Sequence, residues 1–178
     1  MKYVALLRGI NVGKGPRVPM KSLKELLGGL GLADVVTYLN SGNVVFESEL
    51  GSAELTRLIE AELERAFGAK VPTLVKTSAQ MIEIAESIPA EWGSNAREQT
   101  YVAYLFSDVA KPDLVEELPV KREFMDIFYA HEAIVWHIKR ENYNRSHITK
   151  IAGHGSYARM TTRNVNTARK LAALSSEG

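Results

Sequence analysis

The order of the apolar runs in the first 77 residues constrains the fold more than any other feature of the sequence. Short apolar runs typical of strands cover residues 2–7, 35–39, 44–46 and 71–76. Two longer stretches, which follow the first and the third of these runs, carry apolar side chains three or four residues apart, as an amphipathic helix does. The order strand, helix, strand, strand, helix, strand is that of a ferredoxin-like βαββαβ unit. We therefore predict an α+β lobe over residues 1–77.

Turn and cap residues separate these runs. Asn40-Ser41-Gly42-Asn43 lies between two of the expected strands and is a strong signal for a hairpin turn. We expect Ser52 to cap the second helix and Gly68 to end it. Pro72 cannot donate a ladder hydrogen bond, so the fourth strand is predicted at an edge of the sheet.

The rest of the chain indicates a second lobe of related order. Ser78 is expected to cap a helix that Pro89 ends. Residues 101–106 are apolar on both faces of a strand, which is typical of a central strand. A short helix begins at Pro112 and precedes a second hairpin.

The C-terminal third is polar and basic up to a final helix, which we expect to start at Thr161 or Thr162. The predicted fold class is thus α+β with two packed lobes and no true linker. The first lobe is ferredoxin-like, and the second, over residues 78–178, is a related αβαββ arrangement followed by a C-terminal helix.

Charge is distributed unevenly along the chain. The 22 basic and 21 acidic residues give a net charge of only +1, which excludes a generally basic protein that binds polyanions throughout its surface. However, residues 1–24 hold six basic residues and no acidic one, and residues 139–170 hold eight basic residues against Glu141 alone. If these ends share a face, that face attracts anions. The alternative is that they are solvated surface or pair with the acidic middle.

Several classes of protein are excluded by what the sequence lacks. Without cysteine there is no disulfide, thiol catalysis or cysteine-ligated zinc. The apolar run from Tyr3 to Leu7 is too short for a signal peptide core of about 7–15 residues or for a membrane span of about 20. We therefore expect a cytoplasmic protein that does not enter a membrane. His131 and His137 match no standard metal-ligand spacing, and neither a metal nor a cofactor is expected.

Three segments together resemble one bacterial family. They are Leu7-Arg8-Gly9-Ile10-Asn11-Val12-Gly13, then Thr37-Tyr38 through Ser41-Gly42-Asn43-Val44 to Phe46, and finally Thr162-Arg163-Asn164 with Asn166-Thr167. In this order and spacing they resemble the family called domain of unknown function (DUF) 1697, over essentially the whole chain. The resemblance implies a two-lobed α+β fold in a soluble bacterial protein, with no established activity.

The chain departs from the family pattern at two positions. Gly13-Lys14 stands where the family usually has a pair of glycines, and Val165 stands where an aromatic residue is often found. A role that needs that aromatic ring is therefore not carried over to this chain.

The glycine-rich loop after the first strand is one candidate site. Its glycines let backbone N–H groups approach a phosphate, and the helix start that follows favours an anion by about 0.3–1 kcal/mol. Lys14 and Arg17 add positive charge. The loop fits neither the P-loop pattern nor G-x-G-x-x-G. The structural alternative is a flexible connection in which Asn11 caps locally.

The basic C-terminal region is the second candidate. At the expected helix start, Arg163 can reach a carboxylate or phosphate in bidentate fashion, and Asn164 can fix a turn or contact a base. The alternative is an ordinary N-cap whose arginine pairs with an acidic residue of the middle segment. Upstream, aromatic and basic residues interleave, as in proteins that stack on single-stranded nucleic acid, although an ordinary amphipathic surface has the same pattern. These residues are Tyr143, Arg145, His147, Lys150, Tyr157 and Arg159.

These observations favour a binding module for a phosphate-bearing ligand, either a nucleotide or a nucleic acid. The predicted ligand-binding residues are Arg8, Asn11, Lys14, Arg17, Ser41, Asn43, Arg163 and Asn164. One alternative is a small transferase or hydrolase with His154 as general base and Ser156 or Thr162 nearby. Another is a homo-oligomeric interaction protein, in which the basic ends of one subunit meet the acidic middle of another. The sequence does not decide whether the protein is an enzyme.

Overall fold

The computed structural model describes residues 1–177, and the chain divides into two compact units. Unit 1 consists of Met1–Ile82 and Leu171–Gly178, and unit 2 of Glu83–Lys170. Both divisions fall inside helices, α3 (Ser78–Ser87) and α5 (Val165–Ser176), whereas the sequence placed the boundary just before the first of these helices.

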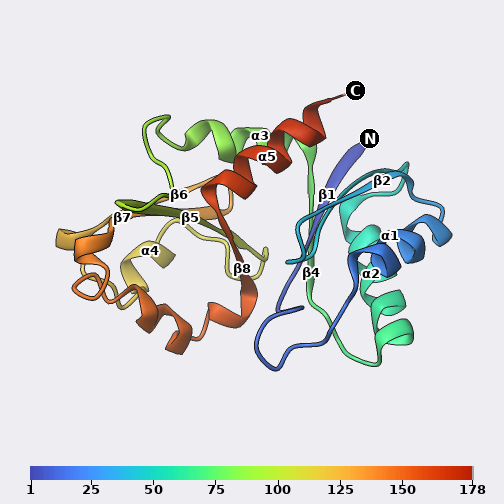
Figure 1. Ribbon diagram of the computed structural model, residues 1–178, viewed down its shortest axis with the longest axis horizontal. Coiled ribbons are helices and arrows are strands. Elements are labelled where there is room, and N and C mark those ends of the chain that lie inside the picture. Colours follow the sequence, from blue (N-terminus) through green and yellow to red (C-terminus); the bar gives the residue numbers. More distant parts are fainter. Residues whose placement is uncertain (178) are drawn as a thin grey trace. The chain divides into compact units, whose positions relative to one another are not determined.

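Unit 1 contains a four-stranded antiparallel sheet in the order β2-β3-β1-β4. Its elements in chain order are β1 (Lys2–Leu7), α1 (Met20–Gly29), β2 (Ala33–Tyr38), β3 (Asn43–Glu47), α2 (Ser52–Phe67) and β4 (Thr73–Thr77) (Figure 1). This order and pairing form the predicted ferredoxin-like βαββαβ arrangement. β4 lies at an edge of the sheet, as Pro72 indicated.

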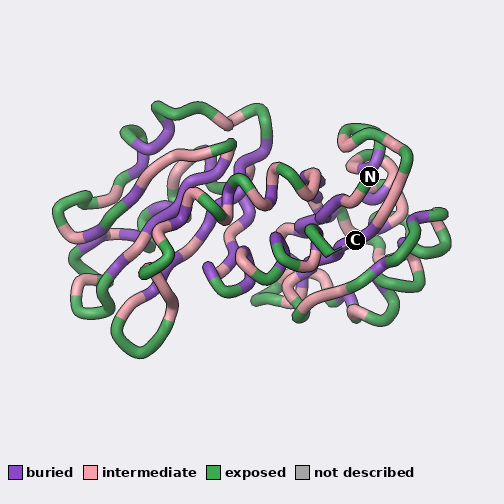
Figure 2. The backbone as a smooth tube through the Cα atoms, turned by 90° about the horizontal axis from the view of Figure 1, so that it is seen from above, coloured by how far each residue is buried: buried purple, intermediate pink, exposed green. Residues whose placement is uncertain are grey.

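The helices of unit 1 pack on one face of its sheet. Alternate residues of β1 and the apolar stripes of both helices form one core cluster, because the strand period of two and the helix period of 3.6 each place them on one side. Buried members of the cluster are Tyr3, Ala5, Leu7, Leu23, Leu27, Leu55, Ile59 and Leu63. Figure 2 shows buried positions running along the strands and exposed positions in the turns.

Two helix starts differ from the prediction by one residue. α2 and α3 begin at Ser52 and Ser78 themselves, so neither serine is the N-cap. Before α3, the Thr77 hydroxyl accepts the Gln80 N–H at 3.2 Å, and Gln80 Oε1 accepts the Thr77 N–H at 2.9 Å. This reciprocal pair is a capping box. The C-terminal end of α2 is as predicted, since Gly68 takes a left-handed conformation there.

Unit 2 contains a second antiparallel sheet, in the order β6-β7-β5-β8. Its elements after α3 are β5 (Glu98–Leu105), α4 (Leu114–Glu117), β6 (Asp126–Ala130), β7 (Ala133–Lys139) and β8 (Met160–Asn164). Counted within each unit, the two sheets have the same strand order. In unit 2, however, the crossover from β7 to β8 is made of short 3₁₀ turns where unit 1 has α2. Two of these turns are η3 (Ile148–Gly153) and η4 (Tyr157–Arg159).

The prediction that the last helix starts at Thr161 or Thr162 is wrong. Both residues belong to β8, which pairs with β5 along its whole length, and α5 begins at Val165. Asn164 is the cap, because its Oδ1 accepts the Asn166 N–H at 2.7 Å. The α+β class and the two lobes are confirmed, and the second lobe has one strand more than predicted. Among residues 1–177, no helix combines the length and the apolar character that a membrane span requires.

Candidate functional site: an aromatic pocket in unit 2

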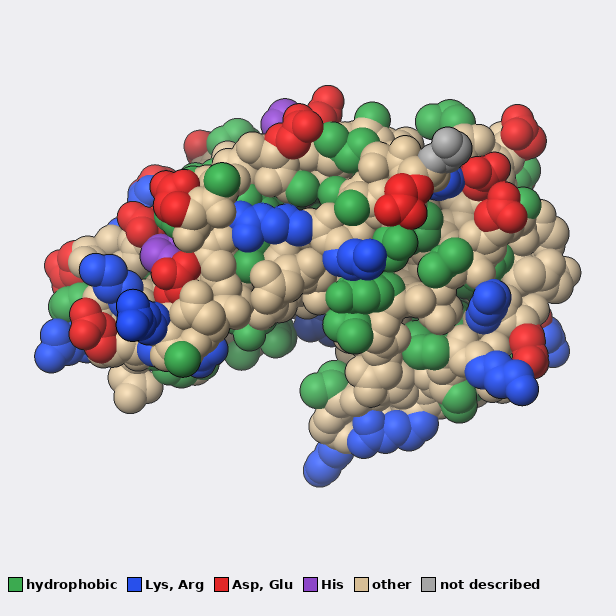
Figure 3. Space-filling model, turned by 45° about the horizontal axis from the view of Figure 1, so that its top comes forward, with side chains coloured by type: hydrophobic (Ala, Val, Ile, Leu, Met, Phe, Trp, Pro, Cys, Tyr) green, Lys and Arg blue, Asp and Glu red, His purple; other side chains and the backbone are tan. Residues whose placement is uncertain are grey.

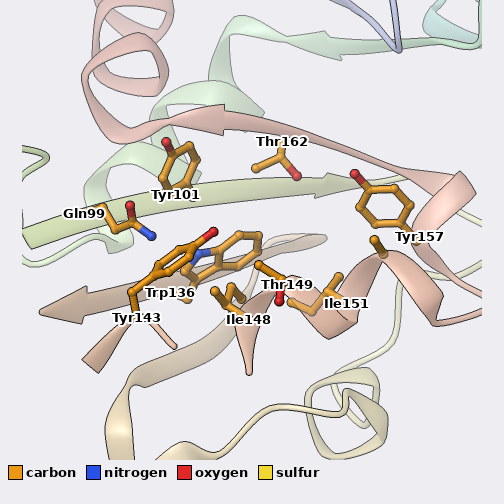
Figure 4. A pocket seen from close by; sticks show the side chains of 10 residues that line it. Gln99, Tyr101, Trp136, Tyr143, Ile148, Thr149, Ile151, Tyr157 and Thr162 are labelled. Carbon is orange, nitrogen blue, oxygen red and sulfur yellow. The ribbon is translucent and has the colours of Figure 1, made fainter. Parts of the chain in front are cut away.

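A pocket of about 430 Å³ opens in unit 2 between the sheet and the β7–β8 crossover (Figure 4). Its size falls in the range of about 300–1,000 Å³ that small-molecule sites occupy. The sheet contributes Gln99, Tyr101, Trp136 and Thr162, and the crossover contributes Tyr143, Ile148, Thr149, Ile151, Ala152 and Tyr157.

Strand pairing makes the floor of the pocket. Gln99 and Tyr101 lie two residues apart on β5, so both side chains leave the same face of the sheet. Tyr101 is directly opposite Trp136 on β7, and their rings stack with centroids 6.1 Å apart and planes at 25°. Thr162 of β8 lies opposite Ala103, which is next on that face.

The crossover makes the opposite wall and the rim. Ile148 and Ile151 are buried in the same core cluster as Trp136, which holds η3 against the sheet. Tyr143 and Tyr157, by contrast, remain 38% and 40% exposed. Figure 4 shows these tyrosines on either side of the pocket. Two accessible rings above a stacked floor suit a flat aromatic ligand.

Positive charge gathers at the crossover, in a group that we call the cationic rim: Lys121, His147 and Lys150. Burial lowers the pKa of His147, and the charges of Lys150 and Lys121 lower it further, so both lysines lie near this imidazole. Lys121 is held there by its backbone N–H, which donates to the Ser146 carbonyl at 2.8 Å. Lys150 lies between Thr149 and Ile151, which both line the pocket. The rim therefore carries positive charge on the crossover that walls the pocket, and its three residues lie outside the pocket lining.

The predicted residues of the first loop lie in unit 1. The Asn11 amide donates to the carbonyls of Val18 and Asn40 at 2.8 and 2.7 Å, and its Oδ1 accepts the Val18 N–H at 2.8 Å. Asn11 thus closes the loop and ties it to the β2–β3 hairpin. Arg17 donates to the Gly13 carbonyl at 3.0 Å, while the Lys14 side chain is exposed.

The hairpin residues Ser41 and Asn43 lie together. Asn43 is fully buried, and its amide donates to the Tyr38 carbonyl and to the Ser41 hydroxyl, both at 2.9 Å. Arg8 is half-buried beside this hairpin, since the N–H of the preceding Leu7 donates to the Gly42 carbonyl at 2.8 Å. These contacts organise the turn, and the ligand roles of Arg8, Ser41 and Asn43 stay predictions.

Arg163 and Asn164 lie in unit 2, outside the lining of the pocket. Arg163 is only 7% exposed and donates to the Thr161 hydroxyl at 2.8 Å and to the Thr162 carbonyl at 3.0 Å. Burial lowers the pKa of the Arg163 guanidinium to about 10, and the neighbouring Tyr104 hydroxyl acts in the opposite direction. Asn164 donates to the Ser94 hydroxyl at 2.8 Å in addition to capping α5.

The two candidate catalytic residues contact each other. His154 Nδ1 lies 2.7 Å from Ser156 Oγ and accepts the Ser156 N–H at 3.2 Å. Because Nδ1 is an acceptor, the ring proton of the neutral histidine belongs on Nε2. Neither residue lines the aromatic pocket, and Ser156 is buried. The His154–Ser156 contact therefore belongs to a local turn within the crossover.

Part of the basic C-terminal region pairs with the acidic middle of the sequence. Arg159 holds Asp108 in a bidentate pair at 3.0–3.1 Å and lies 4.1 Å from the Phe106 ring centroid. The hydrogen bonds from Arg159 hold the pKa of Asp108 below its ordinary value. Figure 3 shows basic and acidic side chains interspersed on the face that it draws. Residues 1–177 contain no cluster of three groups suited to a metal ion.

The sequence indicated Tyr143 and Tyr157 as stacking residues but not Gln99 or Trp136. The alternation along the strands was the available signal for the latter two, because it places Gln99, Tyr101 and Trp136 on one face once the strands are paired.

The similarity to a known structure covers nearly the whole chain. A conserved bacterial protein from Streptococcus pneumoniae has a similar structure, with 27% identity and a TM-score of 0.80 over 98% of each chain. No curated protein matches the sequence. Residues 1–136 match the family described as "Protein of unknown function (DUF1697)", and the match ends within β7, before the crossover. The chain therefore belongs to the DUF1697 family of proteins of unknown function.

Proposed function

We propose that the protein binds a ligand carrying an aromatic base and a phosphate, namely a nucleotide, free or within a nucleic acid. The observation that carries the proposal is that four aromatic side chains line one pocket: Tyr101, Trp136, Tyr143 and Tyr157. Base–aromatic stacking contributes about 1–3 kcal/mol per base, and it works for any base because every base has a π-face.

The cationic rim supports the phosphate half of the proposal. Lys121 and Lys150 can donate charge-assisted hydrogen bonds to phosphate oxygens, and lysine is a common point charge for phosphate. Arg159 is paired with Asp108, so we assign the phosphate contact to the two lysines of the rim. The proposal thus keeps the predicted ligand class and moves its site to the crossover.

Binding is better supported than nucleophilic catalysis. A serine hydrolase needs its nucleophile in a concave site that substrate can enter. The His154–Ser156 contact is buried on the serine side, and neither residue borders the pocket. The pocket itself offers rings, two threonines and one amide, which suit recognition of a flat heterocycle.

Calorimetric titration with nucleoside monophosphates, ribose 5-phosphate and short single-stranded oligonucleotides tests the proposal. Tyr143→Ala and Tyr157→Ala should each weaken nucleotide binding at least about fivefold, the equivalent of about 1 kcal/mol. Tyr38→Ala, in β2 of unit 1, is the matched control and should bind as the unaltered chain does. Comparing the affinity for nucleoside monophosphates with the affinity for oligonucleotides distinguishes a free nucleotide from a nucleic acid as the ligand.

Two results would overturn the proposal. One is that ribose 5-phosphate binds as tightly as a nucleotide, because stacking would then contribute nothing. The other is that both tyrosine variants keep full affinity while their thermal unfolding is unchanged.

A further inference from the structure

A second hollow in unit 2 lies at one end of the sheet, next to the aromatic pocket. It has a volume of about 440 Å³, and its lining residues are Ala96, Arg97, Glu98, Lys139, Arg140 and Glu141. Arg97 comes two residues before Gln99 of the pocket lining, which places it about 7 Å away along the strand direction. After β7, the Tyr143 N–H donates to the Arg140 carbonyl at 3.2 Å. The hollow therefore adjoins the pocket on the side of Gln99 and Tyr143.

Two arginines lie opposite each other in this hollow. The Arg140 N–H donates to the Arg97 carbonyl at 2.9 Å, which extends the β5–β7 ladder by one pair beyond Glu98 and Lys139. Like charges that lie directly opposite on paired strands destabilise the sheet. Lys139 adds a third positive charge to the same hollow. An anion bound there would remove this repulsion.

The three cations of the hollow are not neutralised by carboxylates. In the part of the chain that the structure describes, residues 1–177, none of them forms an ion pair, although Arg140 Nε donates to the Asn95 carbonyl at 2.6 Å. Glu98 also lines the hollow, but its Oε1 accepts the Gly93 N–H at 2.6 Å. Glu141 is exposed and pairs with none of the three. The hollow thus presents positive charge to a ligand.

From these observations we infer that the arginine pair, Arg97 and Arg140, binds the terminal phosphate of a ligand whose base lies in the aromatic pocket. The inference rests on the proposed function, because it adds a second anion site for the same ligand. A terminal phosphate carries about −1.5 to −2 charge at pH 7 and three free oxygens, whereas a phosphate within a strand carries one negative charge. Two guanidinium groups match the terminal group in charge, and their paired N–H donors suit its oxygens.

Three forms of one dinucleotide test the inference on the unaltered chain: one with a 5′-phosphate, one with a 3′-phosphate and one with neither. Calorimetric titration at a pH of about 7.5 keeps the terminal phosphate fully charged. One of the phosphorylated forms should bind about fivefold or more tightly than the form without a terminal phosphate. The form that gains affinity reports the direction in which the strand lies.

Variants of the arginine pair locate the gain in affinity. Arg97→Gln and Arg140→Gln should each reduce it, and the double variant should abolish it, while the dinucleotide without a terminal phosphate binds as before. Arg97→Lys keeps the charge but loses the planar pair of donors, so it should keep only part of the gain. Arg57→Gln is the matched control, because it removes the charge of an exposed arginine on α2 of unit 1.

Each outcome of this test decides something. A chain that binds none of the three dinucleotides overturns both the proposed function and the role of the arginine pair. A chain that binds all three equally leaves the proposed function standing and overturns the role of the pair. If the arginine variants weaken all three forms alike while their thermal unfolding is unchanged, the pair contacts an internal phosphate and its assignment to the terminal group is wrong.

Discussion

Gly42 shows how one residue fixes the contact between the β2–β3 hairpin and the end of β1. Its φ is +87°, and a Cβ there would lie 2.6 Å from Leu7 Cβ and 2.9 Å from Ile10 Cδ1. Gly42→Ala should therefore lower the free energy of unfolding by about 2–5 kcal/mol, from overpacking of about 1–3 kcal/mol and a left-handed backbone that costs about 1–2 kcal/mol. Urea denaturation of the full chain measures the loss.

Gly28 supplies the control for this prediction. It lies within α1, and no heavy atom is within 4 Å of the Cβ that alanine would add. Gly28→Ala should stabilise the chain by about 0.5–1 kcal/mol, because glycine is a poor helix residue. Similar losses in the two variants would show that the close approach to Leu7 is not what makes Gly42 necessary.

The state of His147 predicts how ligand binding depends on pH. Burial and the charges of Lys150 and Lys121 place its pKa below the ordinary value, so the unfolded chain binds this proton more readily than the folded one. Stability from this group is thus complete above the ordinary histidine pKa of about 6.5 and is lost as pH falls through that region. A phosphate at the cationic rim acts in the opposite direction and raises the pKa of His147.

Ligand binding should consequently take up a proton, and affinity should rise as pH falls from about 7.5 to about 5.5. A dinucleotide is the suitable ligand, because its phosphodiester keeps a constant charge over this range. Isothermal titration in several buffers should detect the proton. His147→Gln should abolish the pH dependence, whereas His154→Gln should preserve it; a dependence that survives in His147→Gln would place the phosphate elsewhere.

At the scale of single elements, the capping box before α3 makes Thr77 the residue that starts this helix. Thr77→Ala should lower the free energy of unfolding by about 1 kcal/mol, because the Gln80 N–H loses its acceptor. Ser52→Ala is the comparison, since Ser52 is already inside α2 and its hydroxyl has no hydrogen-bond partner among residues 1–177. It should change stability by less than about 0.5 kcal/mol. Equal losses would contradict the capping box.

The elements that the sequence predicted correctly are those whose signals are local. Helical spacing, the Asn40–Asn43 turn and Pro72 each act within a few residues, and together they were enough for the βαββαβ order of unit 1. β8 was missed because its strand character comes from pairing with β5, which is far away in the sequence. Its threonines favour both strands and helix caps. Arg163 is buried, although arginine is a residue type usually found on the surface.

The pocket was predictable only in part for the same reason. Its exposed rings, Tyr143 and Tyr157, lie in a basic segment, and the interleaving of aromatic and basic residues there predicted a stacking role for them. Its floor comes from two strands that the sequence describes simply as apolar, and only their register brings Tyr101 opposite Trp136. Gln99 lines the pocket because it leaves the same face of β5 as Tyr101, which composition does not reveal.

For the molecule as a whole, the net charge of +1 implies that attraction to nucleic acid is local. If an oligonucleotide binds through the cationic rim, its two lysines neutralise about two phosphates. The logarithm of the binding constant should then fall with the logarithm of salt concentration with a slope of about −1.4, from about 0.7 per phosphate for single strands. Fluorescence anisotropy between about 50 and 200 mM salt measures this slope.

Variants of exposed lysines locate the charges that produce the slope. Lys150→Ala should reduce its magnitude by about 0.7, whereas Lys24→Ala, on α1 of unit 1, should leave it unchanged. A slope steeper than about −3 would mean that more phosphates are neutralised than the rim can reach. If Lys14→Ala or Arg17→Ala then made the slope shallower, the first loop of unit 1 would be binding nucleic acid, as the sequence originally suggested. A shallow slope that only Lys150→Ala and Lys121→Ala alter would instead confine the phosphate contacts to the crossover, beside the aromatic rings that stack on the base.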